Sequence, residues 1–204
     1  MSFLLSFSRL IDRLSELVGR WVAWLVLAAV LISAANAIVR KLFNASSNAF
    51  LEIQWYLFAG VFLLAAGYTL MRQEHVKIDV FSGRFSKRTQ IGIDLFGLFF
   101  FLLPFVFVTV DLVMPLVIRA YQSGEMSQNA GGLIRWPVYV LLPMGLLLLG
   151  LQAISEIIKR LAFLQGLAPD PTRKHQAKSA EEELAEDLQR QLAERERLAA
   201  EGRK

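Results

Sequence analysis

Four acidic side chains occupy or border long apolar stretches of this chain, where they could carry a proton or a cation: Glu52, Asp94, Asp111 and Glu156. Ionisable groups are costly in a bilayer core, so each is a functional candidate. One hypothesis is a relay through Glu52 and Asp111. The other is structural, because three of the four lie near an end of an apolar stretch and basic residues could neutralise the outer two. Those basic residues are Arg40, Arg119 and Arg135. We favour the structural hypothesis.

The side-chain amides within the apolar stretches give little support to a proton or cation relay. Asn36, Gln54 and Gln152 could each form a hydrogen bond between helices, at about 1 kcal/mol apiece. No apolar stretch combines a Gly/Pro break with clustered carboxylates at mid-membrane, which is where secondary transporters place their substrate sites. The pattern therefore favours a chain without a transport site of its own.

Other chemistry is excluded by residue type. The chain has no cysteine, and its two histidines, His75 and His175, lie outside the apolar stretches and far apart. His75 and Asp79 stand four residues apart and could share a metal on a helix, but two ligands do not make a site, so a hydrogen-bonded pair is favoured. No phosphate-binding loop or nucleophile–base arrangement is present. We expect no cofactor, no metal and no enzymatic activity.

Four apolar segments must position these residues. A bilayer core about 30 Å thick needs roughly 20 apolar helical residues. Residues 21–39, 50–71, 91–118 and 134–158 meet that requirement, and 55% of the whole chain is apolar. The sequence therefore predicts an all-α membrane protein with four transmembrane helices, in a transmembrane domain spanning residues 19–164.

The basic residues predict the orientation, because Lys and Arg concentrate in loops that stay cytoplasmic. Twelve lie on the side of the termini and the 72–90 loop: Arg9, Arg13, Arg20, Arg72, Lys77, Arg84, Lys87, Arg88, Lys159, Arg160, Arg173 and Lys174. Four lie on the other side: Arg40, Lys41, Arg119 and Arg135. We expect both termini in the cytoplasm and the 40–49 and 119–133 loops outside.

The two ends of the chain differ in character from its middle. Residues 1–18 have an apolar stripe opposite charged residues, which predicts an amphipathic helix along the cytoplasmic interface or, alternatively, a helix packed on a partner. Residues 165–178 are predicted to be a linker. Residues 179–204 are predicted to form a charged cytosolic helix, because Ser179 and Glu182 make a capping box and Leu184, Leu188 and Leu192 follow at four-residue intervals.

Local signals predict the ends and bends of the spans. Ser86 is an N-cap candidate for the third span, and Pro104 is expected to kink it. Pro137 suits the first turn of the fourth span. The polar, glycine-rich loop from Tyr121 to Arg135 cannot form its own core, so its shape should depend on what it contacts.

Several short motifs stand out along the chain: Glu52–Ile53–Gln54–Trp55–Tyr56, Gly67–Tyr68–Thr69–Leu70, His75–Val76–Lys77–Ile78–Asp79–Val80, Ser123–Gly124–Glu125–Met126–Ser127, Gly131–Gly132–Leu133, Trp136–Pro137 and Gln152. As a set they resemble the small membrane subunit (DctQ-like) of tripartite ATP-independent periplasmic (TRAP) transporters. The likeness covers roughly residues 15–165. It is greatest to the branch labelled for mannitol or chloroaromatic compounds, a label that does not fix the substrate.

The resemblance implies a division of labour in the bacterial inner membrane. A periplasmic binding protein captures an organic acid, a large multi-span permease subunit moves it with sodium, and the small subunit braces the large one among the membrane lipids, with no nucleic acid involved. Sodium is expected in the large subunit. Docking of the binding protein would use the outer loops, through Arg40, Lys41, Asn44, Arg119, Gln122, Glu125, Gln128 and Arg135.

The alternative is a self-sufficient four-helix carrier, channel or redox anchor. A haem anchor needs histidines within the spans, and a carrier needs polar residues along one face of several spans; the sequence offers neither. We therefore expect an accessory scaffold subunit.

Overall fold

A computed structural model describes residues 2–43, 47–73 and 85–171. Within them, four helices are long and apolar enough to cross a membrane. The elements are α1 (Ser2–Phe43), α2 (Asn48–Arg72), α4 (Lys87–Gly97), the π-helical turn η1 (Leu98–Leu102), α5 (Leu103–Ser123) and α6 (Trp136–Leu164). The predicted all-α membrane class is confirmed. Asn44, His75, Asp79 and the predicted helix 179–204 lie outside the described residues, and the predicted linker does so from residue 172 on.

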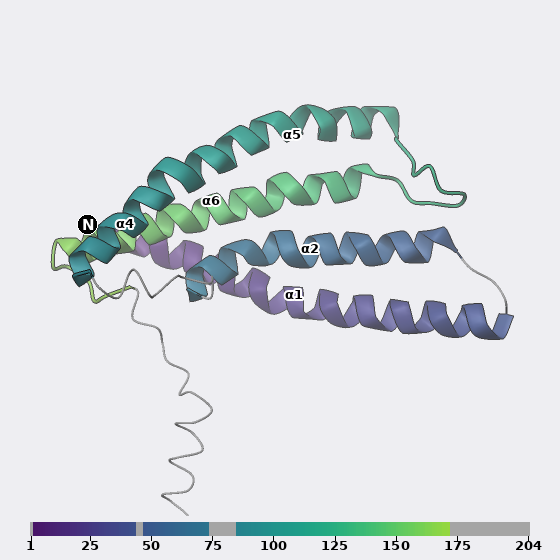
Figure 1. Ribbon diagram of the computed structural model, residues 1–204, viewed down its shortest axis with the longest axis horizontal. Helices are drawn as coiled ribbons and strands as arrows, with labels where there is room; N and C mark the ends of the chain where they lie inside the picture. Colours follow the sequence, from purple (N-terminus) through teal and green to yellow (C-terminus); the bar gives the residue numbers. More distant parts are fainter. Residues whose placement is uncertain (1, 44–46, 74–84, 172–204) are drawn as a thin grey trace, which may run out of the picture. The chain divides into compact units, whose positions relative to one another are not determined.

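Helices α1, α2 and α6 pack on one another, and α5 packs on the other side of α6 (Figure 1). Small residues allow the closest approach. A Cβ added at Gly145 would lie 2.5 Å from the Leu63 carbonyl oxygen, and one at Gly67 would lie 3.2 Å from the Leu148 oxygen. Close backbone contact of this kind is the usual basis of helix association in membranes.

Helix α1 is continuous over 42 residues, about 63 Å at 1.5 Å per residue. The sequence divides this stretch near residue 18, whereas the structure carries one unbroken helix through it. At Gly19 of this helix the Tyr68 ring occupies the space that a side chain would fill, 2.5 Å from an added Cβ. The stripe of apolar residues predicted in 1–18 is exposed within this chain, with Phe3 79% and Leu10 63% accessible.

The third crossing bends through η1. Its last hydrogen bond runs from the Leu103 amide to the Leu98 carbonyl, five residues back, and Pro104 follows directly. A π-turn accommodates a proline that lacks an amide hydrogen and would crowd the preceding turn. The expected disturbance at Pro104 is thus present as a π-turn just before it, and Figure 1 shows the curve from α4 into α5. Ser86 caps α4 as predicted, accepting from the Thr89 amide at 3.3 Å.

Candidate functional site

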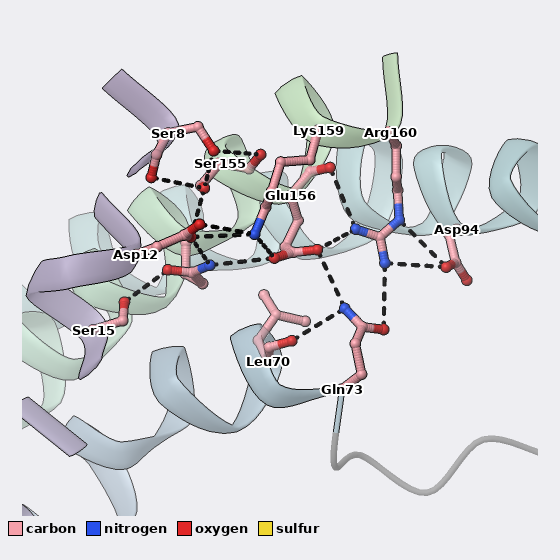
Figure 2. A network of polar contacts seen from close by, with 11 residues as sticks. Ser8, Asp12, Ser15, Leu70, Gln73, Asp94, Ser155, Glu156, Lys159 and Arg160 are labelled. Carbon is pink, nitrogen blue, oxygen red and sulfur yellow. Dashed lines mark hydrogen bonds and ion pairs between the residues drawn. The ribbon is translucent and has the colours of Figure 1, made fainter. Parts of the chain in front are cut away.

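A buried ion cluster lies where α6 ends, and Arg160 is its centre (Figure 2). The Arg160 and Glu156 side chains are 2% and 1% exposed and form an ion pair along α6. Nη2 of Arg160 is also 3.1 Å from Asp94 Oδ2 on α4, and it donates to Gln73 Oε1 at 3.4 Å just after α2. One guanidinium therefore joins three segments of the chain.

The same cluster continues to α1 through Asp12. Lys159 pairs with Glu156 and lies 3.2 Å from Asp12 Oδ1. Asp12 Oδ1 also accepts from Gln152 Nε2 at 2.8 Å and from Ser155 Oγ at 2.9 Å. Further along α1, Ser15 donates to Gln152 Oε1 at 2.7 Å, and the hydroxyls of Ser8 and Ser155 share a hydrogen bond of 2.7 Å. We call these ten residues the polar network: Ser8, Asp12, Ser15, Gln73, Asp94, Gln152, Ser155, Glu156, Lys159 and Arg160.

The polar network is fully paired, although its carboxylates outnumber its cations by one. Three carboxylates, Asp12, Asp94 and Glu156, face two cations, Lys159 and Arg160. Among the described residues, no buried side-chain nitrogen or oxygen lacks a hydrogen-bond partner. A buried network that is fully paired rigidifies its surroundings, whereas removal of one ion from a buried pair is strongly destabilising. The role of this cluster is therefore structural: it holds α1, α4, α6 and the end of α2 in one arrangement.

The opposite end of the helices carries a second polar contact, between Glu52 and the loop 124–135. Glu52 is 4% exposed and accepts from the Leu133 amide at 2.6 Å, from Asn129 Nδ2 at 2.8 Å and from the Ser127 hydroxyl. Tyr56 of the same helix donates its hydroxyl to the Ile134 carbonyl at 3.0 Å. One face of α2 thus fixes the loop, and we call the contacts of Glu52 the loop latch.

Glycines let the loop close on Glu52. Gly131 adopts φ +69°, a left-handed conformation that favours glycine. A Cβ added at Gly132 would lie 2.5 Å from Ser127 Cβ and 2.8 Å from Glu52 Oε1. The Ser127 amide donates to the Leu133 carbonyl at 2.9 Å across the loop. The motif residues Glu52, Gly131 and Gly132, far apart in sequence, therefore form one structural unit.

The loop latch bears on two roles expected of basic residues, which are neutralisation of an outer carboxylate and docking of the binding protein. Glu52 takes its partners from the loop, while Arg40 is an exposed residue near the end of α1. Arg135 lies 4.0 Å from Glu125 and donates to the Tyr139 hydroxyl at 3.4 Å, so these two docking candidates face each other. Of the remaining docking candidates, four others are exposed like Arg40: Lys41, Arg119, Gln122 and Gln128.

The other motif residues serve helix contacts. Tyr68 packs on Gly19 and accepts from Arg72 Nε at 3.0 Å. Pro137 lies in the first turn of α6 as predicted. Gln152 is fully buried in the polar network, and Gln54 is half-buried on α2.

Asp111 does not pair with Arg119. Asp111 is exposed on α5, and Arg119 donates instead to the Pro115 carbonyl at 3.3 Å. The structure thus separates Glu52 and Asp111, the two ends of the hypothetical relay, because one is enclosed by the loop and the other faces away from the chain's own helices.

Of the ten residues of the polar network, sequence reasoning singled out only Asp94, Gln152 and Glu156. It used Lys159 and Arg160 only to set the orientation, and it grouped Asp12 with the charged residues opposite the apolar stripe of residues 1–18. Two signals were present: Glu156 and Arg160 stand four residues apart on a helix, and Ser8, Asp12 and Ser15 recur at helical spacing. Their partner segments could not be paired without the structure.

Two hollows accompany these sites, and both open to the surface. One of about 220 Å³ lies beside the loop latch, lined by Trp55, Tyr56, Tyr139 and Arg135 among others. One of about 340 Å³ lies beside Asp94 and Arg160. In the described ranges no group of three His, Cys, Asp or Glu residues could hold a metal ion.

These features define a class: a membrane protein of the all-α type whose buried polar groups bind its helices to one another. The chain belongs to the DctQ family, because the model for "Tripartite ATP-independent periplasmic transporters, DctQ component" matches residues 29–163. It is therefore a small subunit of a TRAP transporter in the inner membrane, partnered by the large DctM subunit and a substrate-binding protein, and not an enzyme. The match does not support the mannitol or chloroaromatic branch. No curated protein sequence and no solved structure matches the chain.

Proposed function

We propose that this chain is the scaffold that braces the large permease subunit and takes no part in the substrate or sodium sites. The observation that carries the proposal is the division of its surface. In the part of the chain that the structure describes, the buried polar groups are paired with one another, as in the polar network, while large apolar side chains such as Phe62 and Phe107, each 75% exposed, cover the outside of the helices. Such a molecule offers apolar area to a partner and to lipid, with its own helices already fixed.

The transported solute is proposed from the family alone: an organic acid moved with sodium by the large subunit. A self-sufficient carrier would need polar side chains lining a path between its helices. Among the described residues, the buried polar groups near either end of the helices, and Gln152 near the middle of α6, are all paired with other groups of the chain, so they support a brace rather than a path.

Reconstitution tests this function directly. Proteoliposomes that contain this chain alone should take up no organic acid when a sodium gradient and the binding protein are supplied. Vesicles that contain both membrane subunits should take it up. Uptake by this chain alone at a rate near that of the two subunits together would refute the scaffold function and support the alternative of a self-sufficient four-helix carrier.

The orientation is also a proposal, with both termini cytoplasmic and the loop 124–135 outside. It rests on the twelve-to-four distribution of basic residues. The chain has no native cysteine, so single cysteines report cleanly. Gln128→Cys should react with an impermeant thiol reagent in intact cells that have a permeabilised outer membrane, and Ser179→Cys should react only after lysis. The reverse pattern would overturn the orientation.

Docking of the binding protein on the outer loops requires variants that spare the loop itself. Glu125 and Arg135 face each other, so their reversal would also disturb the loop. Lys41→Glu and Arg119→Glu change exposed charges instead. Charges at the edge of an interface mainly set the rate at which two proteins meet. These variants should therefore raise the binding-protein concentration needed for half-maximal uptake and leave the maximal rate unchanged. An unchanged concentration dependence in both would remove the docking role.

A further inference from the structure

Asp111 is a carboxylate inside a membrane crossing, and its side chain is exposed rather than packed against the other helices that the structure describes. Helix α5 packs on α6 through Val106, Val117 and Ala120, which recur at helical intervals and are buried. At about 100° per residue, Asp111 lies about 140° around the helix from Val106. It is accordingly exposed, and it has no hydrogen-bond or ion-pair partner among the described residues.

The residues that surround Asp111 are apolar. Phe107 and Leu112 are 75% and 71% exposed, and Val108 is 52% exposed. The predicted crossing 91–118 has its middle near residue 104, so Asp111 lies about 10 Å from that middle along the helix, at 1.5 Å per residue. The half-thickness of the hydrocarbon core is about 15 Å. The short aspartate side chain therefore begins inside the core rather than at its edge.

A carboxylate at that depth has to be compensated. Acidic residues within crossings almost always face protein or a water-filled cavity and pair with another group, because exposure to acyl chains costs several kcal/mol. A second copy of this chain cannot supply the compensating cation, because its four predicted crossings contain no Lys and no Arg except Arg135 at one edge. The compensating group must come from a different chain.

We propose that the outward face of α5 around Asp111 is the surface that binds the large permease subunit, and that a transmembrane helix of that subunit places an arginine or a lysine against Asp111. The inference rests on the proposed scaffold function and extends it by naming the surface and the chemistry of the contact. Apolar residues such as Phe107 supply the area of the contact, and Asp111 fixes its register.

The test substitutes Asp111 in the complete transporter and measures how much large subunit co-purifies. Asp111→Leu should lower that amount about tenfold, because it leaves the partner's donor buried and unpaired. Asp111→Glu should keep most of it. In isolation, the Asp111→Leu variant should unfold at the same temperature as the native chain, because Asp111 binds nothing within the described part of the chain. Gln122→Leu makes a matched change on the same side of α5 at its exposed end, and should leave co-purification unchanged.

The contrary outcomes are distinct. If Asp111 faced lipid, Asp111→Leu would remove a costly charge and would leave co-purification equal or higher, which overturns the inference alone. If the native chain itself failed to co-purify with the large subunit, both the scaffold function and the proposed contact surface would be refuted. Phe107→Cys, modified with a crosslinker in cells, should attach to the large subunit. Attachment only to a second copy of this chain would overturn the proposed partner.

Discussion

The two ends of the helices solve the problem of buried charge in different ways. At the polar network, Arg160 and Lys159 form ion pairs with carboxylates from three helices, and the contacts join segments up to 147 residues apart. At the loop latch, Glu52 forms no ion pair within the described residues and accepts hydrogen bonds from one backbone amide, one hydroxyl and one side-chain amide of a single loop. The first arrangement determines how helices pack, and the second determines only how one loop folds.

This difference separates global from local stability. Breaking a contact shared by several helices changes the free energy of unfolding of the whole bundle, whereas freeing a loop opens one region and leaves the helices packed. Disruption of the polar network should therefore lower both stability and assembly. Disruption of the loop latch should change the outer surface while assembly persists.

The largest expected effect is that of Arg160→Leu. It leaves Glu156 and Asp94 without their shared cation, and loss of one partner from a buried pair costs about 3–5 kcal/mol. The unfolding midpoint of the purified chain in detergent should fall sharply. Arg13→Leu, on an exposed face of α1, should change it little. Equal midpoints for the two variants would show that the polar network does not hold the helices.

A smaller and local effect is expected of Glu52→Ala. Ser127, Asn129 and the Leu133 amide lose their common acceptor, so the loop should be cleaved by added protease many times faster. The unfolding midpoint should stay close to that of the native chain. Glu125→Ala removes a carboxylate from the same loop without touching the latch and should alter cleavage less. A large fall in midpoint for Glu52→Ala would mean that both ends act globally.

Alanine substitutions at the two loop glycines should raise the protease sensitivity of the loop for different reasons. Gly132→Ala places a methyl group against Ser127 and Glu52, so the loop of this variant should be as sensitive to protease as the loop of Glu52→Ala. Gly131→Ala strains a left-handed backbone at a cost of about 1–2 kcal/mol but meets no neighbour within 4 Å. Combined with Glu52→Ala, the Gly132 variant should add little further sensitivity and the Gly131 variant should add its own. Full additivity in both pairs would argue that Gly132 acts independently of Glu52.

The smallest effect is expected of removing residues 172–204. Their high charge and the prolines before them are typical of an appendage rather than of a membrane core. Ending the chain after Pro171 keeps the contact of Lys87 with Asp170 at 3.5 Å. Uptake by the assembled transporter should be unchanged. Loss of uptake at normal membrane levels would show that the tail binds something essential.

The sequence predicted the class and the crossings because length and apolarity are local properties. Ser86 as a cap and Pro137 in the first turn were likewise readable from neighbouring residues. The partners of Arg160 and Glu52 were not, because they depend on how helices distant in sequence cross. The contact of Gly19 in α1 with the Tyr68 ring likewise joins residues that are distant in sequence.

The central claim is that the polar groups of this chain build structure and do not move solute. The most direct test measures uptake per assembled complex for Arg160→Leu, Glu52→Gln and Asp111→Asn. The account predicts that uptake falls only as far as the amount of co-purified complex falls, so the rate per complex stays constant at saturating binding protein. A variant that assembles fully with the large subunit yet transports at a small fraction of the native rate would contradict it.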